Sequence, residues 1–116
     1  MIKIEIYKNA LGNIFKYLVE GHAGYAERGN DIVCAAVSML TQTTLIALNE
    51  VAEIDEKYIE YKIDEEKGIL EVSIPKDLPN EKLNIANTIL KTMEVGVKAL
   101  IDSYPKYITL KYREVE

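Results

Sequence analysis

The chain contains one histidine and one cysteine, His22 and Cys34, both within the stretch EGHAGYAERGNDIVCAAVSML of residues 20–40. A cysteine thiolate is a strong nucleophile, and a nearby imidazole can take its proton and later protonate a leaving group. With Cys34 as nucleophile and His22 as general base, the two side chains form a minimal set of groups for acyl transfer. The sequence therefore raises the possibility of covalent catalysis through sulfur.

The position of Cys34 just after a helix-capping residue favours a charged sulfur. Asn30 or Asp31 can serve as the N-cap of a helix that begins here. If Asp31 is the cap, Cys34 lies in the first turn, where free backbone amides and the helix dipole stabilise negative charge. The same amides could hold a developing oxyanion. A second role for Asp31, orienting His22, remains open beside the capping role.

Purely structural explanations are available for these residues as well. Cysteine is among the most often buried residue types, and a lone histidine near a loop is commonly a surface residue. Ser38, one helical turn after Cys34, can hydrogen-bond near the site or merely back to a carbonyl of its own helix. One histidine and one cysteine cannot complete a zinc shell without carboxylates, so no metal site is expected.

Three glycines surround the pair, and their spacing indicates a turn or a lid. Gly21, Gly24 and Gly29 fit neither the dinucleotide-binding nor the phosphate-loop pattern. GHAG matches the G-x-x-G of KH modules, but here it is expected to follow a strand. Small residues around YAER would let the loop of residues 24–30, with Tyr25, open and close over a substrate. A plain glycine-rich turn explains them equally well.

The elements that must position these residues follow from periodicity. Alternation of apolar and polar residues predicts five strands, the first being MIKIEIYK, where isoleucine recurs at every second position. Gly68 in DEEKG can take the positive φ of a hairpin turn. The expected strands are residues 1–8, 15–20, 58–63, 69–74 and 106–116.

Apolar residues spaced by three and four predict two helices. The first starts at Asp31 and ends near residues 50–56, and the second runs from Asn80, a plausible cap, to Ser103. The order ββαββαβ predicts an α+β fold with one sheet and two helices packed on it, in a single domain of residues 1–116. The expected buried stripes are Val33, Val37, Leu40, Thr44, Leu48 and Val51, and Leu83, Ala86, Leu90, Met93, Val97 and Leu100.

Composition excludes several classes of function. The formal net charge is −5, from 14 Lys plus Arg against 19 Asp plus Glu, so direct nucleic-acid binding is disfavoured and basic peptides are favoured. A single cysteine and the absence of an apolar leader predict a reducing, cytoplasmic location. The most apolar segment is interrupted by Ser38 and by TQTT at residues 41–44, which indicates a core helix and no membrane span.

The stretch GHAGYAERGNDIVCAAVS resembles the signature of the bacterial ribosomal-processing cysteine protease family. The resemblance covers essentially the whole chain. It implies a small homodimeric peptidase without a cofactor, which removes a short N-terminal extension from a large-subunit ribosomal protein. It also implies that Cys34 is the nucleophile, that His22 is its general base, and that Gly24 to Asn30 form a mobile loop over the cleft.

Two other functions are compatible with the same residues. One is a non-enzymatic, ribosome-associated module that binds a peptide or RNA and in which the thiol is incidental. The other is a redox-sensing or thioester-handling protein. The sensor is disfavoured because the chain has no second cysteine to resolve a sulfenic acid.

Overall fold

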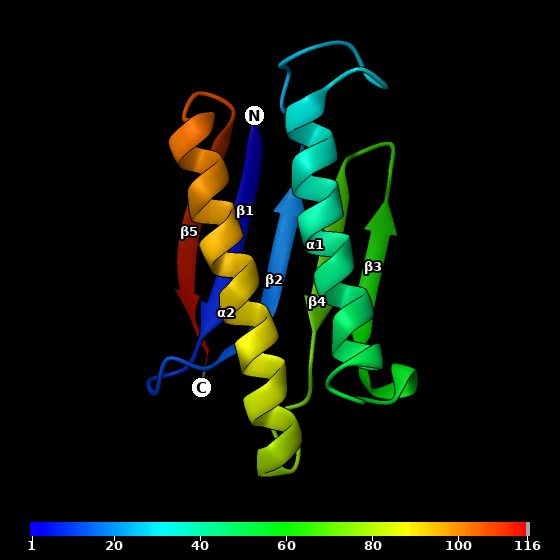
Figure 1. The fold of residues 1–116 in the computed structure, drawn as a ribbon, viewed down its shortest axis with the longest axis vertical. Helices are drawn as coiled ribbons and strands as arrows, with labels where there is room; N and C mark the ends of the chain where they lie inside the picture. Colours follow the sequence, from blue (N-terminus) through cyan, green and yellow to red (C-terminus); the bar gives the residue numbers. More distant parts are fainter. Residues whose placement is uncertain (116) are drawn as a thin grey trace.

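The computed structural model describes residues 1–115 and contains one five-stranded sheet with both long helices on the same face (Figure 1). The element order confirms the predicted α+β class. The elements are β1 (Ile2–Lys8), β2 (Ile14–Glu20), α1 (Ile32–Glu50), a short 3-10 helix η1 (Glu56–Tyr58), β3 (Glu60–Asp64), β4 (Ile69–Ser73), α2 (Asn80–Ser103) and β5 (Ile108–Glu114).

The strands follow the order β3-β4-β2-β1-β5 across the sheet. β1 pairs antiparallel with β2 and parallel with β5, so that Ile2 lies opposite Ile108. β4 lies antiparallel between β2 and β3, which leaves β3 as one edge. In Figure 1, α1 lies in front of β2 and β4 while β3 extends beyond it. Side chains of α1 and of the edge strand β3 line a groove between these two elements.

Alternation along the strands buries one face of the sheet beneath the helices. Ile2, Ile4 and Ile6 are nearly completely buried, as the first strand pattern predicts. Tyr17 of β2 is also completely buried, and its hydroxyl donates a hydrogen bond of 2.7 Å to the carbonyl of Thr41 in α1. This bond satisfies the one polar atom of the ring inside the core and fixes α1 on β2.

One predicted strand start and one predicted helix cap are wrong, whereas the predicted bounds of α2 are confirmed. β3 starts at Glu60, two residues later than expected, because the Asp55 side chain accepts from the Lys57 amide and caps η1. Asn80 is already helical; Pro79 occupies the N-cap position of α2 and provides no side-chain hydrogen bond. The last strand starts two residues later than expected and spans Ile108–Glu114; residue 116, also part of the predicted strand, lies outside the described residues.

The buried stripe of α1 is displaced from the predicted one at two positions. Val51 is exposed and Leu40 is half-buried, whereas Thr41 is buried. Thr41 tolerates burial because its hydroxyl donates a hydrogen bond of 2.8 Å to the carbonyl of Val37.

The polar residues of α1 lower the hydropathy of this helix less than the sequence analysis predicts. With a mean hydropathy of 1.6, α1 is long and apolar enough to cross a membrane by length and composition alone. The core helices of soluble proteins can be equally long and apolar.

Candidate active site

Asp31 sets the start of α1 and thereby the position of Cys34. Asp31 has extended backbone angles, and its Oδ1 accepts hydrogen bonds of 3.0 Å from the amides of Val33 and Cys34. The predicted cap is confirmed, and Cys34 lies in the first turn of the helix.

The second carboxylate oxygen of Asp31 holds the loop that precedes the helix. Its Oδ2 accepts from the amides of Tyr25 at 3.0 Å and Ala26 at 3.2 Å. Burial alone would raise the pKa of Asp31, but the four amide donors outweigh it and hold the pKa below its usual value. Both oxygens thus serve the loop and the helix start, and no hydrogen bond joins Asp31 to His22 within residues 1–115.

The sulfur of Cys34 is half-buried and contacts the backbone beside His22. The amide of Ala23, the residue after His22, donates to Sγ of Cys34 at 3.2 Å. A donor in this position stabilises negative charge on sulfur. The histidine segment at the end of β2 and the first turn of α1 therefore meet at the sulfur atom.

His22 and Cys34 share the walls of two cavities. The inner cavity, of about 220 Å³, lies between α1 and the β3–β4 hairpin, and Gln42 and Ile63 also line it. The loop cavity, of about 410 Å³, lies beneath the loop of residues 24–30 and includes Asp31. Ser38 lines both cavities. The structure thus brings together the predicted histidine, cysteine and serine.

The imidazole of His22 is held by the turn between β3 and β4. Its Nε2 lies 2.9 Å from the carbonyl oxygen of Glu66. No hydrogen bond links the ring to Cys34 in the described part of the chain. The two side chains share cavity walls without a direct hydrogen bond between them.

The helix-start amides do not form the free oxyanion site that the sequence suggested. The amides of Val33 and Cys34 donate to Asp31 Oδ1, and the amide of Ala35 donates to the Asp31 carbonyl at 3.0 Å. The carboxylate also places negative charge at the helix start, where it offsets the positive end of the helix dipole and leaves less of it to stabilise an oxyanion. Polar side chains of α1 that line the inner cavity are Ser38, Thr41 and Gln42, and the hydroxyl of Thr41 already donates to the carbonyl of Val37.

The loop of residues 24–30 is exposed but is tied to the rest of the protein at both ends. The ring of Tyr25 packs edge-on against Tyr104 and Tyr107, with centroid distances of 5.7 and 5.2 Å. Gly24 and Gly29 have positive φ values of 70° and 92°, with open space where a Cβ would lie. Their role is therefore backbone conformation, and Tyr25 anchors the loop instead of lining either cavity.

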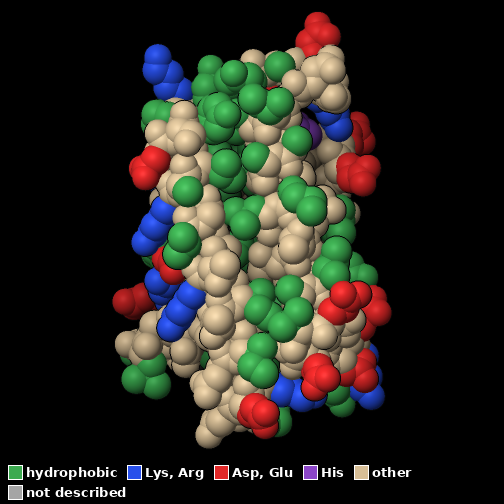
Figure 2. All heavy atoms as spheres, viewed as in Figure 1, with side chains coloured by type: hydrophobic (Ala, Val, Ile, Leu, Met, Phe, Trp, Pro, Cys, Tyr) green, Lys and Arg blue, Asp and Glu red, His purple; other side chains and the backbone are tan. Residues whose placement is uncertain are grey.

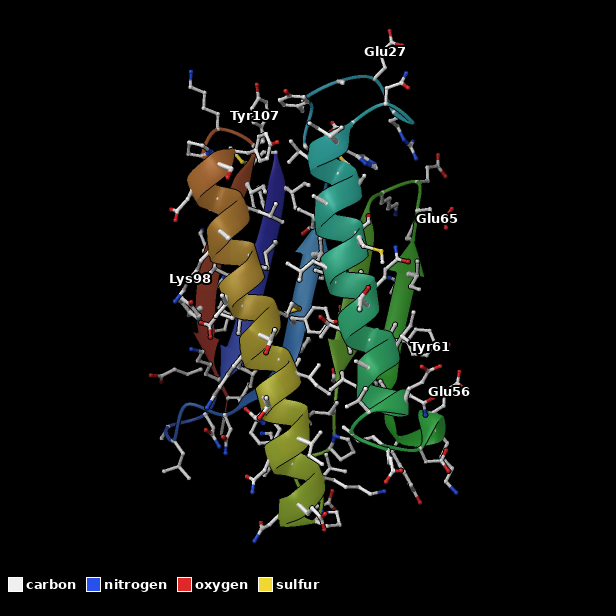
Figure 3. All side chains as sticks on the ribbon, viewed as in Figure 1. Glu27, Glu56, Tyr61, Glu65, Lys98 and Tyr107 are labelled. Atoms are coloured by element: carbon white, nitrogen blue, oxygen red, sulfur yellow. The ribbon has the colours of Figure 1, made fainter. Side chains whose placement is uncertain are left out.

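Sequence reasoning missed a second groove beside the inner cavity. This lateral groove, of about 390 Å³, shares Gln42 and Ile63 with the inner cavity and continues along α1 and β3. Figure 3 shows Glu56 and Tyr61, which line it, beside the lower part of α1. Gln42 could have been found two turns after Cys34 on one helical face. No sequence pattern near Cys34 indicates that β3 forms the other wall of this groove.

No group of three or more His, Cys, Asp or Glu residues suited to a metal ion occurs among residues 1–115. The inner cavity offers the thiol of Cys34, the imidazole of His22, the hydroxyl of Ser38 and the carboxamide of Gln42, and Asp64 and Glu65 also line it. This set suits nucleophilic attack on a carbonyl and proton transfer.

Comparison with known proteins identifies close relatives. Residues 1–109 match the family described as cysteine protease Prp. The ribosomal processing cysteine protease Prp of Mycoplasma genitalium is 32% identical over the full length of both chains. That of Staphylococcus aureus is 27% identical and covers 97% of this chain and 100% of its own. A crystal structure of the S. aureus protease with a covalently linked product peptide matches with a TM-score of 0.83, 27% identity and the same coverage.

Proposed function

We propose that this chain, which belongs to the cysteine protease Prp family, removes a short N-terminal extension from a large-subunit ribosomal protein by means of a Cys34–His22 pair. It is a cysteine peptidase, and thus a hydrolase. The observation that carries the dyad is that His22 and Cys34 line the same two cavities, with the Ala23 amide donating to the sulfur at 3.2 Å.

The reaction proceeds in two stages. His22 takes the thiol proton, and the Cys34 thiolate attacks the scissile carbonyl to form a tetrahedral intermediate. The imidazolium then protonates the leaving amine, which departs and leaves a thioester on sulfur. His22 next takes a proton from water as the water oxygen attacks the thioester carbonyl; the C–S bond then breaks, the acid product leaves, and the imidazolium returns the proton to the Cys34 sulfur. Ser38 and Gln42 are the side-chain donors available to the oxyanion.

The substrate chain lies in the inner cavity and continues along the lateral groove. Leu45, Ile46 and Tyr61 give this groove an apolar wall, and Glu50 and Glu56 place acidic groups beside it. The groove thus suits apolar side chains near a basic residue. The S. aureus structures with a product peptide and with a substrate peptide support peptide binding by this fold.

The loop of residues 24–30 serves as a lid over the bound peptide. Gly24 and Gly29 provide the backbone freedom that opening requires, and the Tyr25 ring gives the closed position a defined contact. A lid that closes over the thioester would keep stray water from it.

Cleavage of the cell's own extended ribosomal proteins tests the function. The purified precursors are incubated with the wild type, with Cys34→Ala and with Lys91→Ala, an exposed control on α2. We expect one truncated large-subunit protein, detected by mass spectrometry, from the wild type and the control and none from Cys34→Ala. Full activity of Cys34→Ala would contradict the proposed mechanism. A ribosomal protein that binds but is not cleaved would favour a non-enzymatic binding module.

We also propose that the protein is a cytoplasmic homodimer. The surface that best suits a second copy is the interhelix groove, a mostly apolar depression of about 790 Å³ along the outer junction of α1 and α2. Figure 2 shows hydrophobic side chains gathered along this junction. Met39, which lines it, is 71% exposed. A second copy would cover this apolar surface.

A further inference from the structure

We propose that the backbone carbonyl of Glu66 positions His22 for catalysis by holding the ring proton on Nε2 and leaving Nδ1 as the base. This inference rests on the proposed Cys34–His22 pair. It assigns to the β3–β4 turn the orienting task that a side-chain amide performs in Cys-His-Asn proteases.

The chemistry of the carbonyl determines the tautomer. A carbonyl oxygen only accepts hydrogen bonds, so the Nε2 atom that lies 2.9 Å from it must carry a hydrogen. In the neutral ring, the lone pair that accepts a proton is then on Nδ1. When Cys34 ionises, its S–H bond breaks and an Nδ1–H bond forms. The Nε2–H bond to Glu66 persists and becomes stronger because the ring is now charged.

Asp31 is not available for the same task. Both of its carboxylate oxygens accept backbone amides, two from the loop and two from the first turn of α1. An orienting role would require it to release at least one of these donors. The carbonyl of Glu66 is the acceptor that the histidine ring contacts.

Gly68 allows the turn to approach the histidine this closely. The amide of Gly21 donates to the carbonyl of Gly68 at 3.1 Å, which joins the turn to the residue before His22. A Cβ at Gly68 would lie 2.4 Å from the Gly21 carbonyl oxygen and 3.1 Å from Cε1 of His22. Gly68 also has a φ of +66°. A larger residue at this position must push the turn away from the ring.

The same turn also holds the loop. The guanidinium of Arg28 donates to the carbonyl of Glu65 at 3.2 Å, beside the carbonyl that holds His22. The turn is itself organised by the Lys67 amide, which donates to Asp64 Oδ1 at 3.1 Å. Adjacent carbonyls therefore fix the loop and the imidazole. Displacement of the turn would change the lid and the base together.

Nuclear magnetic resonance of the unliganded protein with 15N-labelled histidine tests the tautomer directly. At a pH where the ring is neutral, we expect a protonated Nε2, an unprotonated Nδ1, and a ring hydrogen protected from exchange with water. A proton on Nδ1, or an Nε2 hydrogen that exchanges as fast as in a free imidazole, would overturn the proposal. Neither measurement depends on a substrate.

A pair of variants separates the carbonyl from the side chain. Glu66→Ala retains the carbonyl, so ring protection and the rate of iodoacetamide reaction with Cys34 should match the wild type. Gly68→Ala displaces the turn, so protection should be lost and the alkylation rate near neutral pH should fall by about tenfold, since a hydrogen bond to a charged group is removed. Equal alkylation rates and equal ring protection for Gly68→Ala and Glu66→Ala would refute the assignment.

A chemical substitution keeps the test decisive if Gly68→Ala does not fold. Replacing Lys67 by its α-hydroxy acid converts the carbonyl of Glu66 into an ester carbonyl, a weaker acceptor, and Asp64→Ala controls for the lost Lys67 amide. Slower alkylation and faster ring exchange in the ester alone support the proposal, and identical behaviour of the two contradicts it. If the tautomer is wrong but Cys34→Ala is inactive, the peptidase stands and only the role of the turn is lost.

Discussion

Asp31 shows at the level of one residue how the site is held together. Its two oxygens accept four amides from segments on either side of it in the chain, so one carboxylate fixes both the loop and the helix start. The sequence predicted the capping half of this role. The loop half could not be predicted, because the amides of Tyr25 and Ala26 carry no side-chain signal.

Replacing Asp31 by Ala should destabilise the protein by about 1 to 2 kcal/mol, because the cap and buried amide partners are lost. Asp31 has a lowered pKa, so its stabilisation is complete above the ordinary aspartate value of about 3.9 and is lost as the pH falls through the folded-state value. Urea unfolding at several pH values measures this effect. The stability gap between wild type and variant should be present at pH 7 and should close in acid.

Asp77→Ala provides a matched control, since Asp77 is exposed and lies outside helices and strands. Its stability should follow that of the wild type at every pH. A gap for Asp31→Ala that does not change with pH would mean that the charge of the carboxylate contributes nothing.

At the level of elements, the groove between α1 and β3 is the feature with the clearest consequence for activity. If peptide side chains occupy it, Tyr61→Ala should raise KM by about tenfold, equivalent to ~1.4 kcal/mol, and leave kcat nearly unchanged. Steady-state cleavage of the ribosomal precursor measures both constants. Tyr58→Ala is the control, because Tyr58 is 56% exposed and does not line the groove. Equal effects of the two variants would place the peptide elsewhere.

A charged cluster, made of Lys8, Glu94, Lys98 and Tyr112, joins α2 to β1 and β5. Glu94 is nearly buried and pairs with Lys8 at 2.9 Å and with Lys98 at 3.8 Å, and the Tyr112 hydroxyl donates to it. Burial alone would raise the pKa of Glu94, but these partners hold it below its usual value. Burial and the hydrogen bond to Glu94 raise the pKa of Tyr112 to about 12. Figure 3 labels Lys98 at the outer side of α2.

Substitution of Glu94 by Gln should therefore destabilise the protein by about 1 to 3 kcal/mol at neutral pH. The contribution of Glu94 is complete above about 4.3 and is lost as the pH falls through its lowered folded-state pKa. That of Tyr112 is complete below about 10 and is lost as the pH rises through its raised pKa. Thermal unfolding across this range checks both limits, with exposed Glu81→Gln as control. A flat difference curve would contradict the assignment.

The sequence predicted the elements well because the amphipathic patterns are strong. α2 spans Asn80–Ser103 as expected, and the isoleucines of β1 are buried as expected. The errors occur where local hydrogen bonds compete with periodicity, as at η1 and at Thr41. The pattern of apolar residues contains no information about such bonds.

At the level of the whole molecule, the sequence predicted the fold class but not the strand order. The β1–β5 and β2–β4 pairs join segments far apart in the chain, and hydrophobic alternation does not specify which strands pair. Because the β3–β4 turn is also far from His22 in the chain, its contribution to the site could not be predicted from the sequence. His22 and Cys34 could be assigned together from the sequence, whereas Glu66 contacts His22 only in the folded protein.

A dimer through the interhelix groove should be sensitive to charge at its centre. Met39→Glu should convert a dimer to a monomer, because two buried carboxylates would face each other across a symmetric contact. Light scattering coupled to size exclusion measures the mass directly. Leu11→Glu is a suitable control, since Leu11 is 86% exposed on the β1–β2 turn and lies outside the groove. A dimer that survives Met39→Glu uses another face.

The parallel pairing of β1 with β5 also affects the order in which the sheet can form during synthesis. Synthesis delivers Ile2 early and Ile108 late, so one flank of β1 stays without its neighbour while most of the polypeptide is made. Contacts of such long sequence separation form slowly, and the unpaired backbone groups of an exposed strand edge can pair with other chains. Until residues 108–114 have been made, β1 therefore lacks one of its two neighbours in the sheet.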